Sequence, residues 1–175
     1  MDQELKDKAQ KIKLVIFDVD GVLTDGSLYY DNLGQEFKAF HSRDGHGMKM
    51  LRENGVEIAL ITGRTSNLVL HRAQNLNIQY IYQGQLDKLP AYLDIQKKLG
   101  LNADEISYIG DDVVDLPVMT KVGFAVAVQD AHPLVVKNAH WQTPHPGGKG
   151  AARDLCELLL KAQDKWDAEM QKYLA

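Results

Sequence analysis

Two aspartates, at positions 18 and 20, directly follow an apolar, β-branched run over 13–17. The run predicts a buried parallel strand, so the Asp18 and Asp20 carboxylates are expected at its C-terminal end. Ligands of open α/β sheets bind at that edge, because the helices that follow point their N-termini into it. Aspartate is also a common helix cap, and for an isolated pair that interpretation stays open. Gly21 favours a binding site, since glycine lets the backbone approach a ligand closely.

A second acidic cluster consists of Asp111, Asp112 and Asp115. It follows an apolar run over 106–109 and Gly110, again where a strand is expected to end. Carboxylates this close repel one another, and the cluster costs stability unless a cation or a basic partner is present. A metal ion is the simplest explanation. Hard carboxylate oxygens, together with a phosphate oxygen and water, suit Mg²⁺, so the cluster predicts a magnesium site.

Thr62, Gly63 and Arg64 form a third polar group. It follows the apolar run 56–61, a further predicted strand. Thr62 and the backbone N–H groups after it could hold phosphate oxygens, although the same threonine could simply cap a helix. Lys88 lies near the start of a later predicted helix. Taken alone it predicts little, because most surface lysines are merely solvated.

These polar groups lie on an alternating series of predicted strands and helices. Strands are expected over 13–17, 56–61, 80–82, 106–109 and 124–128, and helices over 44–54, 65–76, 86–99, 116–122, 133–138 and about 151–173. Such alternation implies right-handed crossovers and a parallel sheet with helices on both faces. The predicted fold is a three-layer, Rossmann-like α/β domain over residues 1–175. Residues 1–12 are expected to form a short solvated helix or arm.

A β-hairpin over about 27–41 is expected to interrupt this alternation. The stretches 28–30 and 36–40 flank the turn signal Asp-Asn-Leu-Gly at 31–34. We expect the hairpin to protrude from the sheet edge. Its aromatic side chains would make it a good oligomerisation device. They are Tyr29, Tyr30, Phe37 and Phe40.

Composition excludes several classes of function. No apolar stretch approaches the roughly 18 residues of a membrane span, so insertion into a membrane is not expected. The net charge of −4, with no dense basic tract, argues against binding nucleic acid. The charged first residues lack the apolar core of a signal peptide, which predicts a cytoplasmic protein. The single cysteine, Cys156, fits a reducing cytoplasm as a packed helix residue.

Taken in order, four features resemble the four motifs of the haloacid dehalogenase superfamily. They are FDVDGVLTDG at 17–26, ITGR at 61–64, Lys88, and GDDVVDLPVM at 110–119. The resemblance implies that Asp18 is the phosphoryl-accepting nucleophile and that Asp20 is the general acid and base. It places Thr62 against the phosphate oxygens. It places Lys88 beside Asp18, where its charge would neutralise the nucleophile and the phosphate.

The same resemblance implies a set of metal ligands. Mg²⁺ is expected to be held by Asp18, Asp111 and the backbone carbonyl of Asp20. Asp112 and Asp115 are expected behind these ligands or bound through water. A dehalogenase would need neither the metal nor Asp20. The pattern therefore implies a phosphatase that works through an aspartyl phosphate.

Neither the stretch between Asp20 and Thr62 nor that between Thr62 and Lys88 is long enough for a cap domain. This layout resembles a capless, tetrameric branch of the superfamily that hydrolyses 3-deoxy-D-manno-octulosonate 8-phosphate. The likeness includes HSRDGHGMKML at 41–51 and HPGGKGAARDL at 145–155. It implies a homotetramer that takes part in lipopolysaccharide biosynthesis.

In that branch the TGR arginine and a GGKGA loop help to recognise the sugar acid. Substrate contacts are therefore implied for Gly63, Arg64, Gly147, Gly148 and Lys149. Gly148 and Gly150 could instead form only the turn before the last helix. Arg43 and His46 are further candidates near the start of the helix over 44–54, and they could equally cap that helix or lie on the surface.

Two alternative functions stay open. A closely similar phosphatase acts on 9-phosphates of nine-carbon sugar acids of the sialic acid type, and the sequence leans only in part toward the eight-carbon substrate. A receiver-like phosphoacceptor or a catalytically silent interaction subunit would also combine aspartates with a lysine. Receivers lack the TGR step and the acid two residues after the phosphorylated aspartate, which Asp20 supplies here.

Overall fold

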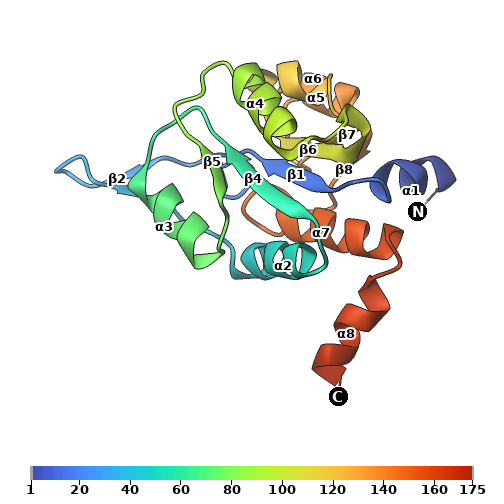
Figure 1. Cartoon of the computed structure of the whole chain (residues 1–175). Coiled ribbons are helices and arrows are strands. Elements are labelled where there is room, and N and C mark those ends of the chain that lie inside the picture. Colours follow the sequence, from blue (N-terminus) through green and yellow to red (C-terminus); the bar gives the residue numbers. More distant parts are fainter. Residues whose placement is uncertain (1, 175) are drawn as a thin grey trace.

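A six-stranded parallel sheet forms the centre of the computed structural model, which describes residues 2–174 (Figure 1). The strands lie in the order β5-β4-β1-β6-β7-β8. Their bounds are β1 Leu14–Phe17, β4 Glu57–Ile61, β5 Tyr80–Tyr82, β6 Ile106–Gly110, β7 Phe124–Ala127 and β8 Trp141–Gln142. Every neighbouring pair is parallel, which confirms the predicted sheet. The short edge strand β8 was not predicted.

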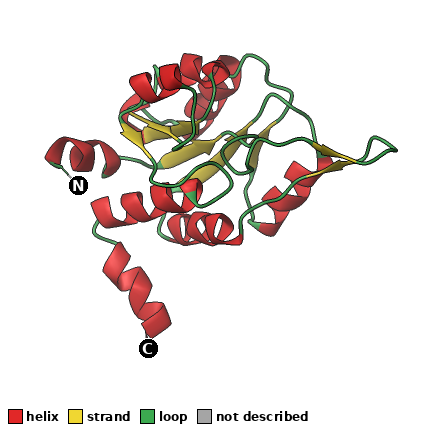
Figure 2. Cartoon of the chain, turned by 180° about the vertical axis from the view of Figure 1, so that it is seen from behind, coloured by secondary structure: helices red, strands yellow, loops and turns green. Residues whose placement is uncertain are grey.

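Helices cover both faces of the sheet (Figures 1 and 2). One face carries α4 (Leu89–Leu99), α5 (Leu116–Met119) and α6 (Pro133–Asn138), and the other carries α2 (Ser42–Glu53), α3 (Asn67–Asn75) and α7 (Ala151–Ala162). Side chains of β1 alternate between the two layers, with Val15 and Phe17 on the α2 side and Leu14 and Ile16 on the α4 side. Because both faces are covered, all four of these residues are buried. The short helix α1 (Gln3–Ala9) packs against α7.

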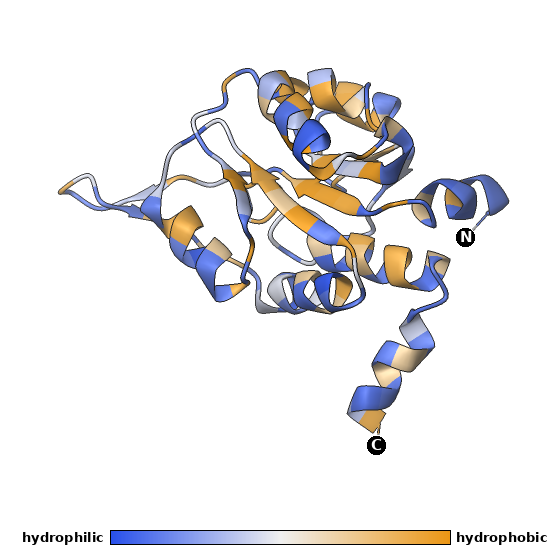
Figure 3. Cartoon of the chain, in the orientation of Figure 1, coloured by the Kyte–Doolittle hydropathy of each residue, from blue (hydrophilic) through white to orange (hydrophobic). Residues whose placement is uncertain are grey.

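The central strands end level with one another. β1 lies between β4 and β6, and Phe17 stands opposite Leu60 and Ile109. β1 is apolar throughout (Figure 3), and every residue of the three strands except Glu57 is buried in the core. Residues that follow these strands are therefore held at a common edge.

Helix α4 begins directly after Lys88, three residues later than predicted. Pro90 lies in its first turn, where the missing backbone N–H is tolerated. The helix ends at Gly100, whose φ of +63° is in the left-handed region that glycine favours. Lys88 thus occupies the cap position, from which its side chain turns into the site.

The predicted single helix over about 151–173 is wrong. Helix α7 ends at Ala162, and a second helix, α8 (Trp166–Leu174), follows after a bend. Asp164 has a φ of +55°, and the backbone N–H of Lys165 donates to the Leu160 carbonyl (2.8 Å). A left-handed residue with such a backward bond is a common helix ending, although glycine is more usual there. The apolar stripe behind the prediction lies wholly within α7, so it carried no information about the following turn.

The predicted hairpin is confirmed, with short strands. β2 (Tyr29–Tyr30) and β3 (Glu36–Phe37) pair antiparallel in a separate sheet. The hairpin protrudes from the domain (Figures 1 and 2). Its exposed apolar side chains are Leu28, Tyr29, Tyr30, Leu33 and Phe37. Among residues 2–174, no helix has both the length and the apolar character needed to cross a membrane.

Candidate active site

Three polar residues meet at the C-terminal edge of the sheet. Asp18 follows β1, Thr62 follows β4, and Asp111 follows β6, and these strands are neighbours. Asp18 and Thr62 are buried, whereas Asp111 is half-buried. Their predicted convergence at one edge is confirmed. Their chemical roles stay predictions.

A tight loop after β1 carries Asp18 and Asp20. The Thr24 hydroxyl oxygen accepts hydrogen bonds from the backbone N–H groups of Gly21 (3.3 Å) and Gly26 (3.2 Å). Gly21 has a φ of +94°, and a Cβ on it would collide with the Asp111 carboxylate. Both the conformation and the close approach therefore require glycine.

The loop over 145–150 braces the loop that carries Asp18. The backbone N–H of Gly148 donates to the Val22 carbonyl (2.9 Å). A Cβ on Gly147 or Gly148 would run into backbone atoms of the Asp18 loop. This close packing is enough to account for both glycines. Their predicted contact with substrate stays a prediction.

Lys88 is the cation at the centre of the site. Its side chain is 2% exposed, and Nζ lies 2.7 Å from Asp18 Oδ1 and 2.6 Å from Asp115 Oδ1. Burial disfavours the charged ammonium, but the two carboxylates outweigh burial and hold the pKa of Lys88 above its ordinary value. A permanent positive charge therefore lies against Asp18.

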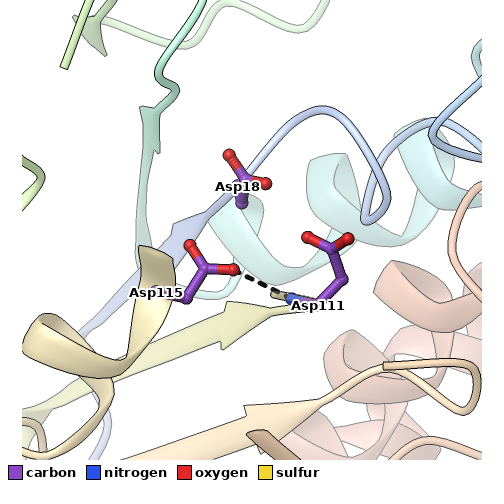
Figure 4. Close-up of side chains that lie close together, drawn as sticks. All are labelled: Asp18, Asp111 and Asp115. Carbon is purple, nitrogen blue, oxygen red and sulfur yellow. Dashed lines mark hydrogen bonds between the residues drawn. The ribbon is translucent and has the colours of Figure 1, made fainter. Parts of the chain in front are cut away.

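Asp115 is fully buried, and both oxygens of its carboxylate accept hydrogen bonds. Oδ1 accepts from Lys88 and from the Tyr108 hydroxyl, each at 2.6 Å. Oδ2 accepts from the backbone N–H groups of Asp111 (2.9 Å; Figure 4) and Asp112 (3.2 Å). These bonds occupy the carboxylate, so Asp115 is suited to hold Lys88 and the turn after β6 in place.

Asp112 has a local part in this turn. Its side chain is exposed and accepts a hydrogen bond from the backbone N–H of Val113 (2.7 Å). It thereby caps the 3₁₀ turn over Val113–Asp115. The predicted place of Asp112 behind the metal ligands stays a prediction.

Asp18, Asp111 and Asp115 present carboxylate oxygens within 4.8 Å of one another (Figure 4). Burial raises the pKa of Asp18 and of Asp111, and the charge of Asp115 adds to both shifts. The charge of Lys88 opposes both pKa shifts without cancelling them. A divalent cation would remove the remaining repulsion, so the residues fit such an ion. Because Asp115 is already occupied, Asp18 and Asp111 are the side chains left to bind it.

Asp111→Asn is expected to stabilise the metal-free protein at alkaline pH. The fold raises the pKa of Asp111 to about 8, mainly through burial, whereas the unfolded chain titrates near pH 4. The folded state therefore holds a proton that the unfolded state has lost. The free energy of unfolding falls as pH rises from about 4 to about 8. At pH 8, each 1 kcal/mol that Asp111→Asn adds to the free energy of unfolding should raise the melting temperature by about 2–4 °C.

Thermal melts in EDTA at pH 5 and pH 8 test this expectation. Asp112→Asn is the matched control, because its carboxylate is exposed. It should follow the wild-type dependence on pH. The same pH dependence in wild type and Asp111→Asn would contradict the electrostatic account of the site.

Charged side chains connect the hairpin to this edge. Arg64 donates to the Tyr30 hydroxyl (2.6 Å) and to Glu36 Oε1 (3.1 Å). Lys38 lies 3.3 Å from Glu36 and forms an ion pair with Asp20. The loops after β1 and β4 are thus both tied to the hairpin. Contacts of Gly63 and Arg64 with substrate stay predictions.

The remaining candidates lie elsewhere. Arg43 and Lys149 line a cavity of about 370 Å³ that does not include Asp18 among its lining residues. His46 lies on α2 with its ring centroid 5.6 Å from that of Tyr173 in α8. Roles for these three side chains in substrate binding stay predictions.

Two polar side chains near the site were not predicted from the sequence. Tyr108 is fully buried on β6 and donates to Asp115. A tyrosine inside a buried strand must find a partner for its hydroxyl, and that signal could have drawn attention to it. Lys38 gave no such signal, because a lysine is ordinary in a protruding hairpin.

Comparisons with known proteins agree with this geometry. The model of the haloacid dehalogenase-like hydrolase family matches residues 73–155. The 3-deoxy-D-manno-octulosonate 8-phosphate phosphatase of Escherichia coli K12 is 49% identical over 160 residues, which are 91% of this chain and 85% of that protein.

Two solved structures extend the likeness to the whole fold. That of the same phosphatase from Moraxella catarrhalis, in complex with magnesium, phosphate and KDO, has a TM-score of 0.96 at 42% identity and covers 99% of each chain. The cobalt-bound Haemophilus influenzae phosphatase has a TM-score of 0.91 at 41% identity and covers 96% of this chain and 99% of its own. Because sequence and fold match over nearly the whole length, this chain belongs to the 3-deoxy-D-manno-octulosonate 8-phosphate phosphatase family of haloacid dehalogenase-like hydrolases.

Proposed function

We propose that this protein is a Mg²⁺-dependent phosphatase in lipopolysaccharide biosynthesis. It hydrolyses 3-deoxy-D-manno-octulosonate 8-phosphate to the free sugar acid and inorganic phosphate. The observation that carries the proposal is the buried ion pair between Lys88 and Asp18, beside Asp111. This arrangement provides a carboxylate nucleophile whose charge is already offset, as attack on an anionic phosphate requires. The relative named for this substrate, 49% identical over 91% of the chain, supports the choice.

The first chemical step transfers the phosphoryl group to Asp18. A carboxylate oxygen attacks phosphorus in line, the bond from phosphorus to the sugar oxygen breaks, and that oxygen takes the proton of Asp20. Lys88 and the hydroxyl of Thr62 offset the charge of the phosphate. Mg²⁺ held by Asp18 and Asp111 would supply further neutralisation.

The second step releases phosphate. Water attacks the phosphorus of the aspartyl phosphate and gives a proton to the Asp20 carboxylate. The bond between phosphorus and the Asp18 oxygen breaks, which frees inorganic phosphate and restores the Asp18 carboxylate. Lys88 stabilises that carboxylate as it forms again, since the two groups lie 2.7 Å apart in the resting protein.

Phosphate release from the eight-carbon 8-phosphate and from the nine-carbon 9-phosphate tests the proposal. With Mg²⁺ we expect kcat/KM to favour the eight-carbon substrate by about tenfold or more, and EDTA to abolish release. A preference for the nine-carbon substrate would assign the protein to the sialic acid type. Stable phosphorylation of Asp18 without release would indicate a phosphoacceptor.

The proposal includes a homotetramer in the cytoplasm. The hairpin exposes five large apolar side chains, three of them on its two short strands, and an isolated pair of strands is marginal in water. Packing against equivalent hairpins in a closed, symmetric assembly would stabilise it. Cys156 is buried and free, which suits a reducing compartment.

Phe37→Glu is expected to break the assembly into smaller species. Phe37 is 55% exposed on β3, so a charge there would be buried only in the assembled state. Activity on the sugar phosphate should fall about tenfold or more, whereas small aryl phosphates, which need little recognition, should be affected much less. Leu93→Glu is the control, because Leu93 is 52% exposed on α4. Light scattering and both assays on one sample decide, and a fully active Phe37→Glu monomer would exclude this role.

A further inference from the structure

Lys38 follows β3 at the base of the protruding hairpin, yet its side chain is only 2% exposed. Its ammonium forms an ion pair with Asp20 Oδ1 and lies 3.3 Å from Glu36 Oε1. A buried ammonium is costly unless it is paired. The hairpin, which lies outside the four superfamily motifs, thus places a paired cation against Asp20, the proposed general acid and base.

The surrounding charges balance. Glu36 is shared between Lys38 and Arg64, whose guanidinium lies 3.1 Å from it. Two cations therefore face two carboxylates, those of Glu36 and Asp20. Without Lys38, only Arg64 would remain, and it contacts Glu36. Asp20 would then lose the cation that holds it in place beside the acidic site.

The contacts on Asp20 are one-sided. Lys38 engages Oδ1, and the part of the chain that the structure describes offers no hydrogen bond to Oδ2. The Asp20 side chain is 19% exposed, so solvent can reach it. One oxygen is therefore anchored and the other is free to exchange a proton.

We infer that Lys38 is a positioning residue for Asp20. By holding Oδ1, it aims Oδ2 at the oxygen that leaves phosphorus in the first step and at the water that attacks in the second. The inference rests on the proposed phosphatase function. Because Lys38 follows β3 directly, the base of the hairpin brings its ammonium to Asp20.

Transient kinetics with 4-nitrophenyl phosphate and Mg²⁺ distinguishes positioning of Asp20 by Lys38 from a direct contact of Lys38 with the phosphoryl group. Nitrophenolate is a stable anion that leaves without a proton, so forming the aspartyl phosphate from it does not need Asp20 as an acid. Hydrolysis of the intermediate still needs Asp20 as a base. Lys38→Met should therefore keep the rapid burst of nitrophenolate and lower the steady-state kcat by about tenfold to a hundredfold. Release from an alkyl sugar phosphate should fall similarly without a burst.

Matched variants exclude a general effect of losing a lysine. Lys49→Met removes an exposed lysine paired with Glu53 on α2, and it should behave as wild type. Lys38→Arg keeps the positive charge and should recover most of the steady-state rate. Lys38→Gln, which keeps a donor but no charge, should resemble Lys38→Met and provides a second uncharged variant.

Three results would overturn the inference. A burst that slows as much as the turnover would place Lys38 on the phosphoryl group itself. Unchanged kinetics in both uncharged variants, or equal losses in Lys38→Arg, would also exclude it. If wild type fails to hydrolyse the eight-carbon substrate, the proposed substrate is wrong. The burst and turnover of wild type and variants with the aryl phosphate still test Lys38 independently.

Discussion

Asp18→Asn is expected to fold normally and to lose phosphatase activity by about 10⁵-fold or more. An amide cannot replace the carboxylate as the phosphoryl acceptor, and Asp18 is the residue that directly follows β1. The fold should survive, because the substitution keeps the shape of a buried side chain and removes one of several crowded negative charges. Phosphate release and a thermal melt on the same sample check both parts.

Asp25→Asn is the matched control for Asp18→Asn. Asp25 is an exposed aspartate in the same loop, with its carboxylate accepting a hydrogen bond from the backbone N–H of Ser27 (2.9 Å). It should retain activity near that of wild type. If Asp18→Asn kept comparable turnover, another residue would have to accept the phosphoryl group.

Lys88→Met is expected to cost both stability and activity. Lys88 is the buried cation between Asp18 and Asp115, at 2.7 and 2.6 Å. Removing one partner of a buried ion pair costs about 3–5 kcal/mol, because the other charge stays buried and uncompensated. For a chain of this size, that lowers the melting temperature by about 6–20 °C. Activity should be lost as well, since Lys88 then no longer offsets the charges of Asp18 and of the phosphate.

Lys98→Met provides the control on the same helix. Lys98 lies near the end of α4 and pairs with Asp94 at 2.7 Å, but both side chains are about half exposed. Exposed ion pairs contribute little to stability, so its melting temperature should stay near that of wild type. If both variants lost the same amount in melting temperature, the buried ion pairs of Lys88 would contribute no more to stability than the exposed pair of Lys98. Adding Mg²⁺ should narrow the deficit of Lys88→Met, because a cation at Asp18 and Asp111 would replace part of the missing charge.

The position of the site followed from local signals in the sequence. Apolar runs before Asp18, Thr62 and Asp111 predicted parallel strands, and parallel strands place the residues after them at one edge. The crowding of Asp111, Asp112 and Asp115 likewise predicted a need for positive charge.

Partners brought together by tertiary packing could not be predicted in the same way. Asp115 was expected near the metal, but its bonds to Lys88 and Tyr108 depend on how α4 packs over β6. Lys38 reaches Asp20 only because the base of the hairpin lies beside the loop after β1. The bend at Asp164 was missed because a non-glycine residue takes the left-handed conformation.

The most direct test of the account is the identification of the phosphorylated residue. Asp20→Asn protein mixed with 4-nitrophenyl phosphate and Mg²⁺ should accumulate the intermediate, because the leaving group needs no proton while the attacking water lacks its base. After rapid acid quench, peptide mass spectrometry should find the phosphoryl group on Asp18. A phosphoryl group on any other residue, or phosphate release with no phosphorylated protein at any time, would contradict the proposed mechanism.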